Sequence, residues 1–202
     1  MDKNLILICL DGARSDFAMK SKILRDFFSG TLFFSKSITY APYTNSSVCA
    51  MISGSYGNRN GCNSYWNSAK FDHENFKTLM MYLKDQNFRT IADIHNDWVL
   101  PQLGFDEYRI YDEDNVDLAI RHPKLIEEIS KKNDQNFFLY LHYESIHTTI
   151  RKEVLEKFNN FDKDYFNEKK KNFDRYSTLF KNAEEYLEKL FKKIIELGLD
   201  KN

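Results

Sequence analysis

Glycine, proline and cysteine are scarce in this sequence, and no apolar run is long enough to cross a membrane. Its 202 residues include 7 glycines, 3 prolines and 3 cysteines, so neither a flexible linker nor a disulfide framework is indicated. Cys9, Cys49 and Cys62 are odd in number and lack metal-ligand spacing, and we expect reduced thiols that serve packing. We therefore place no domain boundary within the chain.

An excess of one charge sign is also missing. Lys and Arg number 29 and Asp and Glu number 30, for a formal net charge of −1, so no overall field attracts nucleic acid or an anionic membrane. Only six apolar residues separate Asn4 from Asp11, which is too few for a secretory leader or a membrane span. We expect a cytoplasmic protein with no membrane segment and no nucleic-acid partner.

The sequence does contain enough apolar material for a core, at 42 % hydrophobic and 15 % aromatic residues. The run from Leu5 to Leu10 is apolar throughout, which favours a strand buried on both faces of a parallel sheet. Strand-like and helix-like segments then alternate, which predicts an α/β fold: a three-layer α/β/α sandwich around a mostly parallel sheet. The expected strands are 5–10, 32–37, 89–94 and 137–142, and the expected helices are 76–86, 116–132 and 176–197.

An acidic residue follows the first expected strand. Asp11 and Gly12 come directly after Leu10, and a carboxylate at the end of a strand is held by rigid backbone, as a metal ligand must be. Ligands of open α/β sheets gather beyond this end of the strands. The alternative is that Asp11 merely caps a helix that begins near Arg14.

A segment rich in hydroxyl groups begins at Thr44. Its pattern resembles the nucleophile region of the alkaline phosphatase and sulfatase superfamily, with Asp11 at the place of the first metal ligand. The matching positions are Thr44, Ser53-Gly54, Tyr56 and Gly61. The resemblance implies that Thr44 is the catalytic nucleophile and a metal ligand. A helix N-terminus would also stabilise an alkoxide and an anionic ester; the alternative is a simple N-cap.

The identity of the nucleophile favours phosphorus over sulfur. In this superfamily, sulfatases use a cysteine or serine that matures to formylglycine in a Cys-x-Pro-Ser-Arg setting, whereas this chain has Thr44-Asn45-Ser46-Ser47-Val48. A threonine at this position is similar to the nucleophile of nucleotide pyrophosphatases, phosphoethanolamine transferases and lipoteichoic acid synthases. The resemblance thus implies a hydrolase or transferase for a phosphate ester of a small molecule, glycan or lipid, with sulfate esters as the second choice.

Further matches imply residues that bind the substrate. His95 and Asn96 stand at the end of the third expected strand, and His147 follows the fourth. By the resemblance, these three residues and Arg14 orient the anionic ester. Structural roles are the alternatives for His95 and His147. His142 lies inside the fourth strand pattern and is interpreted as buried packing.

The sequence stops before the motif that supplies most of the metal ligands in this superfamily, a strand ending in Ser-Asp-His-Gly. The resemblance therefore implies that residues 1–202 are the N-terminal part of a single domain, incomplete at its C-terminus. A divalent metal (Zn, Mn, Mg or Ca) is implied for the complete domain. Self-association, or pairing with a missing C-terminal segment, would cover an open sheet edge. The rival hypothesis is a truncated, inactive remnant or an anion-binding pseudoenzyme.

Overall fold

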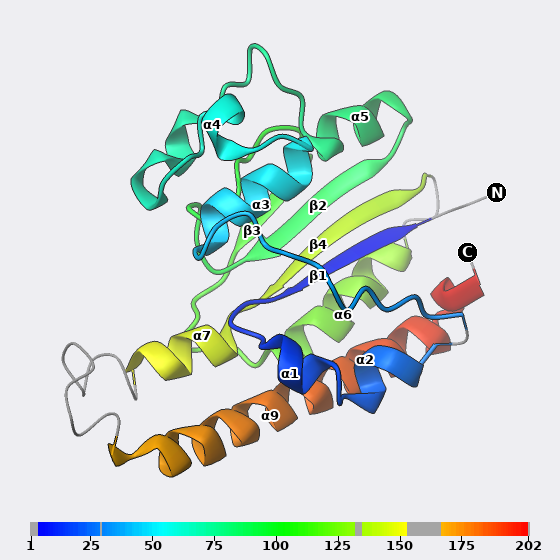
Figure 1. The fold of residues 1–202 in the computed structure, drawn as a ribbon. Coiled ribbons are helices and arrows are strands. Elements are labelled where there is room, and N and C mark those ends of the chain that lie inside the picture. The colour runs from blue at the N-terminus through cyan, green and yellow to red at the C-terminus, as the bar shows by residue number, and fades with distance from the viewer. Residues whose placement is uncertain (1–3, 29, 132–134, 153–166, 202) are drawn as a thin grey trace.

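The computed structural model describes residues 4–28, 30–131, 135–152 and 167–201, and Figure 1 shows its fold. The described strands form one parallel sheet in the order β1-β4-β2-β3. They are β1 (Leu5–Leu10), β2 (Arg89–Ile94), β3 (Glu107–Ile110) and β4 (Phe137–Tyr143). The expected α/β class with a parallel sheet is confirmed.

Strand β4 lies inside the sheet, between β1 and β2. All seven of its residues are buried, as a mostly apolar and aromatic sequence predicts for a strand covered on both faces. It pairs with β1 from Leu5↔Phe138 to Leu10↔Tyr143. This register ends β1 and β4 side by side, so the residues that follow the two strands meet at one edge of the sheet.

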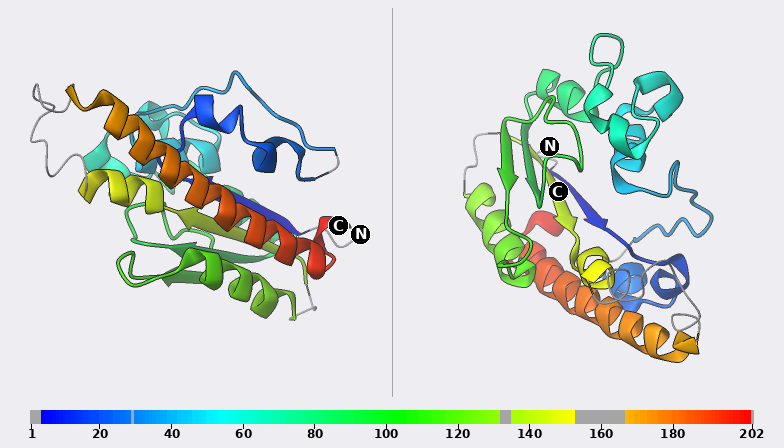
Figure 2. Two further views of the ribbon diagram at one scale, coloured as in Figure 1. Left: turned by 90° about the horizontal axis from the view of Figure 1, so that it is seen from below. Right: turned by 90° about the vertical axis from the view of Figure 1, so that its left-hand side faces the viewer.

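Helices cover both faces of the sheet, as Figures 1 and 2 show. One face carries α3 (Thr44–Ser53), α4 (Gly57–Asn60), the short helix η1 (Tyr65–Lys70) and α5 (Leu79–Asp85). The other carries α1 (Ser15–Ala18), α2 (Lys22–Asp26), α6 (Leu118–Ser130), α7 (Ser145–Ile150) and α9 (Lys169–Glu196), which leads into η3 (Leu199–Lys201). The arrangement is the expected three-layer sandwich.

Alternate residues of the strands supply a core on each face. Towards α6 and α9, the fully buried members include Ile91, Leu139, Leu141, Ile126 and Leu190. Towards α3 and α5, they include Ala92, Tyr140, Ile94 and Met80. Burial of each large apolar side chain contributes roughly 1.5–3 kcal/mol to stability. Among the described helices, none is both long and apolar enough to cross a membrane.

One expected strand is wrong. Residues 31–34 have no regular secondary structure, and Leu32 and Phe34 are 80 % and 77 % exposed. The expected strand at 32–37 rested on local composition, but a strand also needs a partner, and none of the described strands pairs with this segment.

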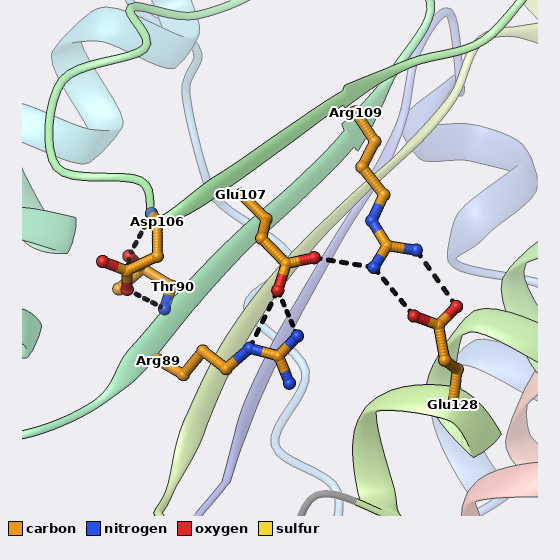
Figure 3. Close-up of polar contacts among 6 residues, drawn as sticks. All are labelled: Arg89, Thr90, Asp106, Glu107, Arg109 and Glu128. Atoms are coloured by element: carbon orange, nitrogen blue, oxygen red, sulfur yellow. Dashed lines mark hydrogen bonds and ion pairs between the residues drawn. The ribbon is translucent and has the colours of Figure 1, made fainter.

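Strand β3 was not expected, because it is short and half of its residues are charged. Figure 3 shows how these charges hold it in place: Glu107 lies between Arg89 of β2 and Arg109. Arg109 also contacts Glu128 of α6 at 3.0 Å. The alternating charges tie β2, β3 and α6 together at the edge of the sheet opposite β1.

Candidate functional site

Asp11 is placed by the end of β1 and by a tight turn. Its N–H donates to Tyr143 O at 2.9 Å, which extends the pairing with β4 by one residue. Gly12 follows with φ +80°, and a Cβ there would lie 3.3 Å from Ile146 Cγ2 and 3.4 Å from His147 N. Glycine is required for this left-handed turn. The turn thereby runs directly against the start of α7.

Thr44 reaches Asp11 from the α3 layer. Its hydroxyl donates to Asp11 Oδ2 at 3.0 Å. The N-cap of α3 is the extended residue Tyr43, and the N-cap of α1 is Arg14, neither with a side-chain capping bond. Neither Thr44 nor Asp11 therefore takes the capping role that was its alternative. The structure instead brings the two side chains together where the α3 layer meets the end of the sheet.

His142 is a site residue that sequence reasoning missed. It is fully buried, as expected, but its Nε2 also lies 3.5 Å from Asp11 Oδ2. Tyr140 hydroxyl contacts its Nδ1 at 3.0 Å. Burial alone would lower the pKa of His142, but Asp11 and Cys9 raise it to about 9. His142 is thus a buried cation beside Asp11. The signal for it is the strand register, which pairs Cys9 with His142.

Asp11 is correspondingly an ionised carboxylate. Burial would raise its pKa, but His142, His147 and the Thr44 hydroxyl together hold the pKa below its ordinary value. Its side chain remains 16 % exposed. The carboxylate is therefore charged near neutral pH, accepts a hydrogen bond from Thr44, and is reachable from solvent.

A cleft of about 580 Å³ opens above this pair. That volume is within the roughly 300–1,000 Å³ typical of small-molecule sites. Five of the expected site residues line it: Asp11, Thr44, His95, Asn96 and His147. Glu113 and Arg151 line it as well, and sequence reasoning identified neither.

Arg14, the remaining expected substrate-binding residue, is placed differently. It does not line the cleft, and its guanidinium pairs with Asp16 at 2.8 Å and 3.0 Å. The guanidinium carbon lies 5.4 Å and 5.3 Å from the ring centroids of Phe17 and Tyr176. After the Gly12 turn the chain heads towards α9, so Arg14 packs there and not in the cleft.

His95 presents a neutral imidazole to the cleft. Burial and the nearby His142 lower its pKa to about 4, and the two ring centroids are 5.0 Å apart. Its buried Nδ1 has no hydrogen-bond partner within the part of the chain that the structure describes. A neutral ring with an unused nitrogen is suited to a polar contact with a bound ligand.

The residues at hand do not form a complete metal site. In the described ranges, no group of three or more His, Cys, Asp and Glu side chains is placed to hold a metal ion. Asp11 and Thr44 offer two oxygen atoms, whereas divalent metals in proteins take four or more ligands.

Similar proteins are found at the level of family and fold. The sequence model of a family described as Sulfatase matches residues 3–202. No curated protein sequence matches the chain. A crystal structure named Ps i-CgsB is similar over 98 % of this chain and 56 % of its own, with a TM-score of 0.62 and 16 % identity.

A second solved structure is the C-terminal periplasmic domain of EcEptC from Escherichia coli, in complex with Zn. It is similar over 97 % of this chain and 59 % of its own, with a TM-score of 0.53 and 12 % identity. This chain therefore spans less than two thirds of the length of either structure. At these identities the likeness shows a shared fold.

Proposed function

This chain belongs to the sulfatase family, whose sequence model matches residues 3–202, and on that premise we propose that it carries the nucleophile of a hydrolase or transferase for phosphate esters. The supporting observation is the Thr44 hydroxyl, 3.0 Å from the Asp11 carboxylate at the base of the cleft. Sulfate esters are the second choice, because a threonine at position 44 is not a residue that matures to formylglycine. The esterified alcohol belongs to a small molecule, a glycan or a lipid.

In the proposed reaction, Thr44 Oγ1 bonds to phosphorus while the bond from phosphorus to the alcohol oxygen breaks. Thr44 loses its proton and the departing alcohol gains one. The ionised Asp11 accepts the Thr44 hydrogen bond and so directs the hydroxyl into the cleft. His95, Asn96 and His147 contact the oxygens of the ester. Water then releases the phosphoryl group in a hydrolase, and a second alcohol accepts it in a transferase.

A divalent metal, with Asp11 and Thr44 among its ligands, is part of the proposal for the complete protein. The similar EcEptC domain in complex with Zn supports it. We further propose that residues 1–202 are the N-terminal part of one domain, since they cover 56 % and 59 % of the similar structures. A cytoplasmic location is also a proposal, because the similar EcEptC domain is described as periplasmic. Cell fractionation tests it.

The proposal is tested by searching for a covalent phosphoryl adduct on the residue at position 44. Nitrophenyl phosphate mono- and diesters, with Zn²⁺, Mn²⁺ or Mg²⁺, are supplied to this chain and to any longer polypeptide that its reading frame encodes. We expect negligible turnover by residues 1–202, because two oxygen ligands do not hold a metal. In the longer polypeptide, mass spectrometry should find phosphothreonine at Thr44, its serine counterpart in Thr44→Ser, and no adduct in Thr44→Ala.

Thr39→Ala is the matched control, since Thr39 also lines the cleft but bonds to Ser47 at 2.8 Å and not to Asp11. Metal-dependent turnover that persists in Thr44→Ala would show that the nucleophile is misassigned. Thr44-dependent turnover by residues 1–202 would show that the site is complete, or that a second chain completes it.

A second candidate is an anion-binding protein without catalysis. In the described part of the chain, Asp11 and Thr44 bring together only two oxygen atoms that could bind a metal. This small number of ligands favours an anion-binding protein. It predicts that no polypeptide from this reading frame forms an adduct, while phosphate still binds the cleft.

A further inference from the structure

Glu144 is a buried acid beside the cleft that the proposed chemistry does not use. It follows the last residue of β4, is the N-cap of α7, and is only 1 % exposed. Thr148 N–H donates to Glu144 O at 2.9 Å, which begins the bonding of the helix. His147, which lines the cleft, belongs to this first turn. The position of Glu144 therefore bears on where α7 carries His147.

Tyr111 connects Glu144 to two strands of the sheet. Its N–H donates to Ile94 O at 2.9 Å, at the end of β2 and next to His95. Its hydroxyl oxygen lies 2.6 Å from His142 O of β4 and 2.5 Å from Glu144 Oε2. Tyr111 is itself buried. This one side chain thus joins the ends of β2 and β4 to the start of α7.

A count of protons decides the charge of Glu144. The Tyr111 hydroxyl has one proton, whereas a backbone carbonyl and a carboxylate can only accept hydrogen bonds. Both contacts of this hydroxyl are slightly shorter than the usual O···O hydrogen-bond distance of about 2.7–2.8 Å, and two oxygen atoms this close repel each other unless a proton lies between them. Tyr111 can supply the proton for His142 O or for Glu144 Oε2, but not for both. The second proton therefore belongs to Glu144, which is a neutral carboxylic acid that donates to Tyr111.

The surroundings of Glu144 support the neutral state. Burial raises the pKa of Glu144 above its ordinary value, helped by Glu113, whereas Tyr111, the backbone of Glu144 itself and His142 act in the opposite direction. The titratable groups that face Glu144 are Tyr111 and Glu113 from the segment after β3, His142 and Tyr143 from β4, and Tyr186 from α9. Of these groups, His142 alone is a cation, and Asp11 already balances its charge at 3.5 Å.

We propose that Glu144 is a positioning residue whose side chain stays protonated at neutral pH. Its proton bonds to the Tyr111 hydroxyl, and the Tyr111 proton bonds to His142 O. These two hydrogen bonds hold the start of α7 against the ends of β2 and β4, and so keep His147 at the cleft. The inference rests on the proposed function only where His147 is given a contact with the ester.

Infrared spectroscopy of residues 1–202 at neutral pH tests the protonation. The carbonyl band of a neutral carboxylic acid is separate from the bands of carboxylates and amides. We expect the difference spectrum between the unaltered chain and Glu144→Gln to show the loss of one such band. Glu113→Gln is the matched control, because Thr148 and Arg151 keep the pKa of Glu113 lowered despite its burial. Its difference spectrum should show the loss of a carboxylate instead.

Hydrogen exchange at the Thr148 amide tests the effect on α7. Glu144→Gln should leave its protection unchanged, because an amide N–H can donate to Tyr111 as the acid does. Tyr111→Phe and Glu144→Ala should speed the exchange by about fivefold, the change expected when one hydrogen bond is lost. As pH rises through the raised pKa of Glu144, protection relative to the intrinsic exchange rate should fall in the unaltered chain and stay constant in Glu144→Gln.

Each outcome bears on the inference. A spectrum without a neutral carboxyl band that depends on Glu144 overturns it, and so does a Glu144→Gln variant that fails to fold or exchanges faster at Thr148. If Tyr111→Phe speeds exchange equally at Leu139, inside β4, the local role is wrong and the loss of stability is global. Tyr111→Phe serves alone if Glu144→Ala does not fold. None of these measurements requires turnover, so the search for phosphothreonine at Thr44 succeeds or fails separately.

Discussion

Asp93 is a fully buried carboxylate in β2 with two partners from α6. Arg121 contacts its two oxygens at 2.7 Å and 2.8 Å, and His122 Nε2 lies 3.3 Å from Oδ2. On its other side, His122 Nδ1 contacts the Tyr186 hydroxyl of α9 at 2.7 Å. A buried charge is tolerated only when it is paired in this way. The cluster joins the sheet to both long helices beneath it.

This cluster predicts that acid destabilises the protein. Burial, together with the nearby Arg121 and His142, lowers the pKa of His122 more than Asp93 raises it. The ordinary pKa of histidine is about 6.5. As pH falls below this value, the His122 side chain is protonated in the unfolded chain before it is protonated in the folded chain. The free energy of unfolding therefore decreases until pH has passed the lowered pKa of the folded state. In His122→Asn, the free energy of unfolding should fall less between pH 7 and pH 5. Urea denaturation at several pH values measures this free energy. If it changed with pH in the same way in His122→Asn and in the unaltered protein, the prediction would be wrong.

Single side chains show where sequence reasoning stops. Asp11 was identified because it follows a predictable strand, and Thr44 because its segment resembles the nucleophile region of the superfamily; the structure puts their side chains 3.0 Å apart. Arg14 was expected in the cleft, but its direction depends on the Gly12 turn and on α9, which local sequence does not encode. His142 required the β1–β4 register. Arg151 belongs to no pattern, and only the folded cleft reveals it.

Helix α9 reaches across the structure to the loop that follows β1. The Tyr176 hydroxyl donates to Gly12 O at 2.9 Å and accepts from Arg14 N–H at 2.7 Å. Its ring packs against Phe17, with centroids 4.8 Å apart. One side chain of the last long helix therefore fixes the turn that carries Asp11.

Tyr176→Phe tests this clamp. The ring remains while both hydrogen bonds are lost, and we expect the free energy of unfolding to fall by about 1–3 kcal/mol. Hydrogen exchange at the Arg14 amide should become faster. Tyr186→Phe is the matched control, because Tyr186 is a buried tyrosine of the same helix whose hydroxyl bonds to His122. Unchanged exchange at Arg14 in Tyr176→Phe, or faster exchange in both variants, would argue against a local clamp.

At the scale of elements, continuous apolar runs were the dependable signal. The bounds of β1 and β2 match the expected strands, and β4 extends one residue further. Helix α9 begins at Lys169, earlier than the expected start at Tyr176, because its first turns are polar and carry no apolar periodicity. Strand β3 was not predicted, because ion pairs hold it in place instead of apolar contacts, and these ion pairs are seen only in the folded structure.

The sheet as a whole has an open side at β1. This strand pairs with β4 and with no other described strand, and Leu5 is 42 % exposed. Apolar edges pair with other chains, and we propose concentration-dependent self-association, measured by light scattering. Leu5→Lys should reduce it. Ile110→Lys, on the opposite edge strand β3 and 53 % exposed, should matter less, since β3 already carries charges. A monodisperse monomer at all concentrations would defeat this expectation.

The pairing of β1 with β4 also determines when the sheet can form during synthesis of the chain. Phe137 N–H donates to the Asn4 side chain across 133 residues of sequence, so β1 leaves the ribosome long before β4 exists. At 5–20 residues per second, the wait is roughly 7–27 seconds. During that interval Leu5 to Leu10 has no neighbour in the sheet, and Asp11 has neither His142 nor the His147 turn beside it. We expect nascent chains shorter than about 150 residues to depend on chaperones, and the cleft to form only once α7 has emerged.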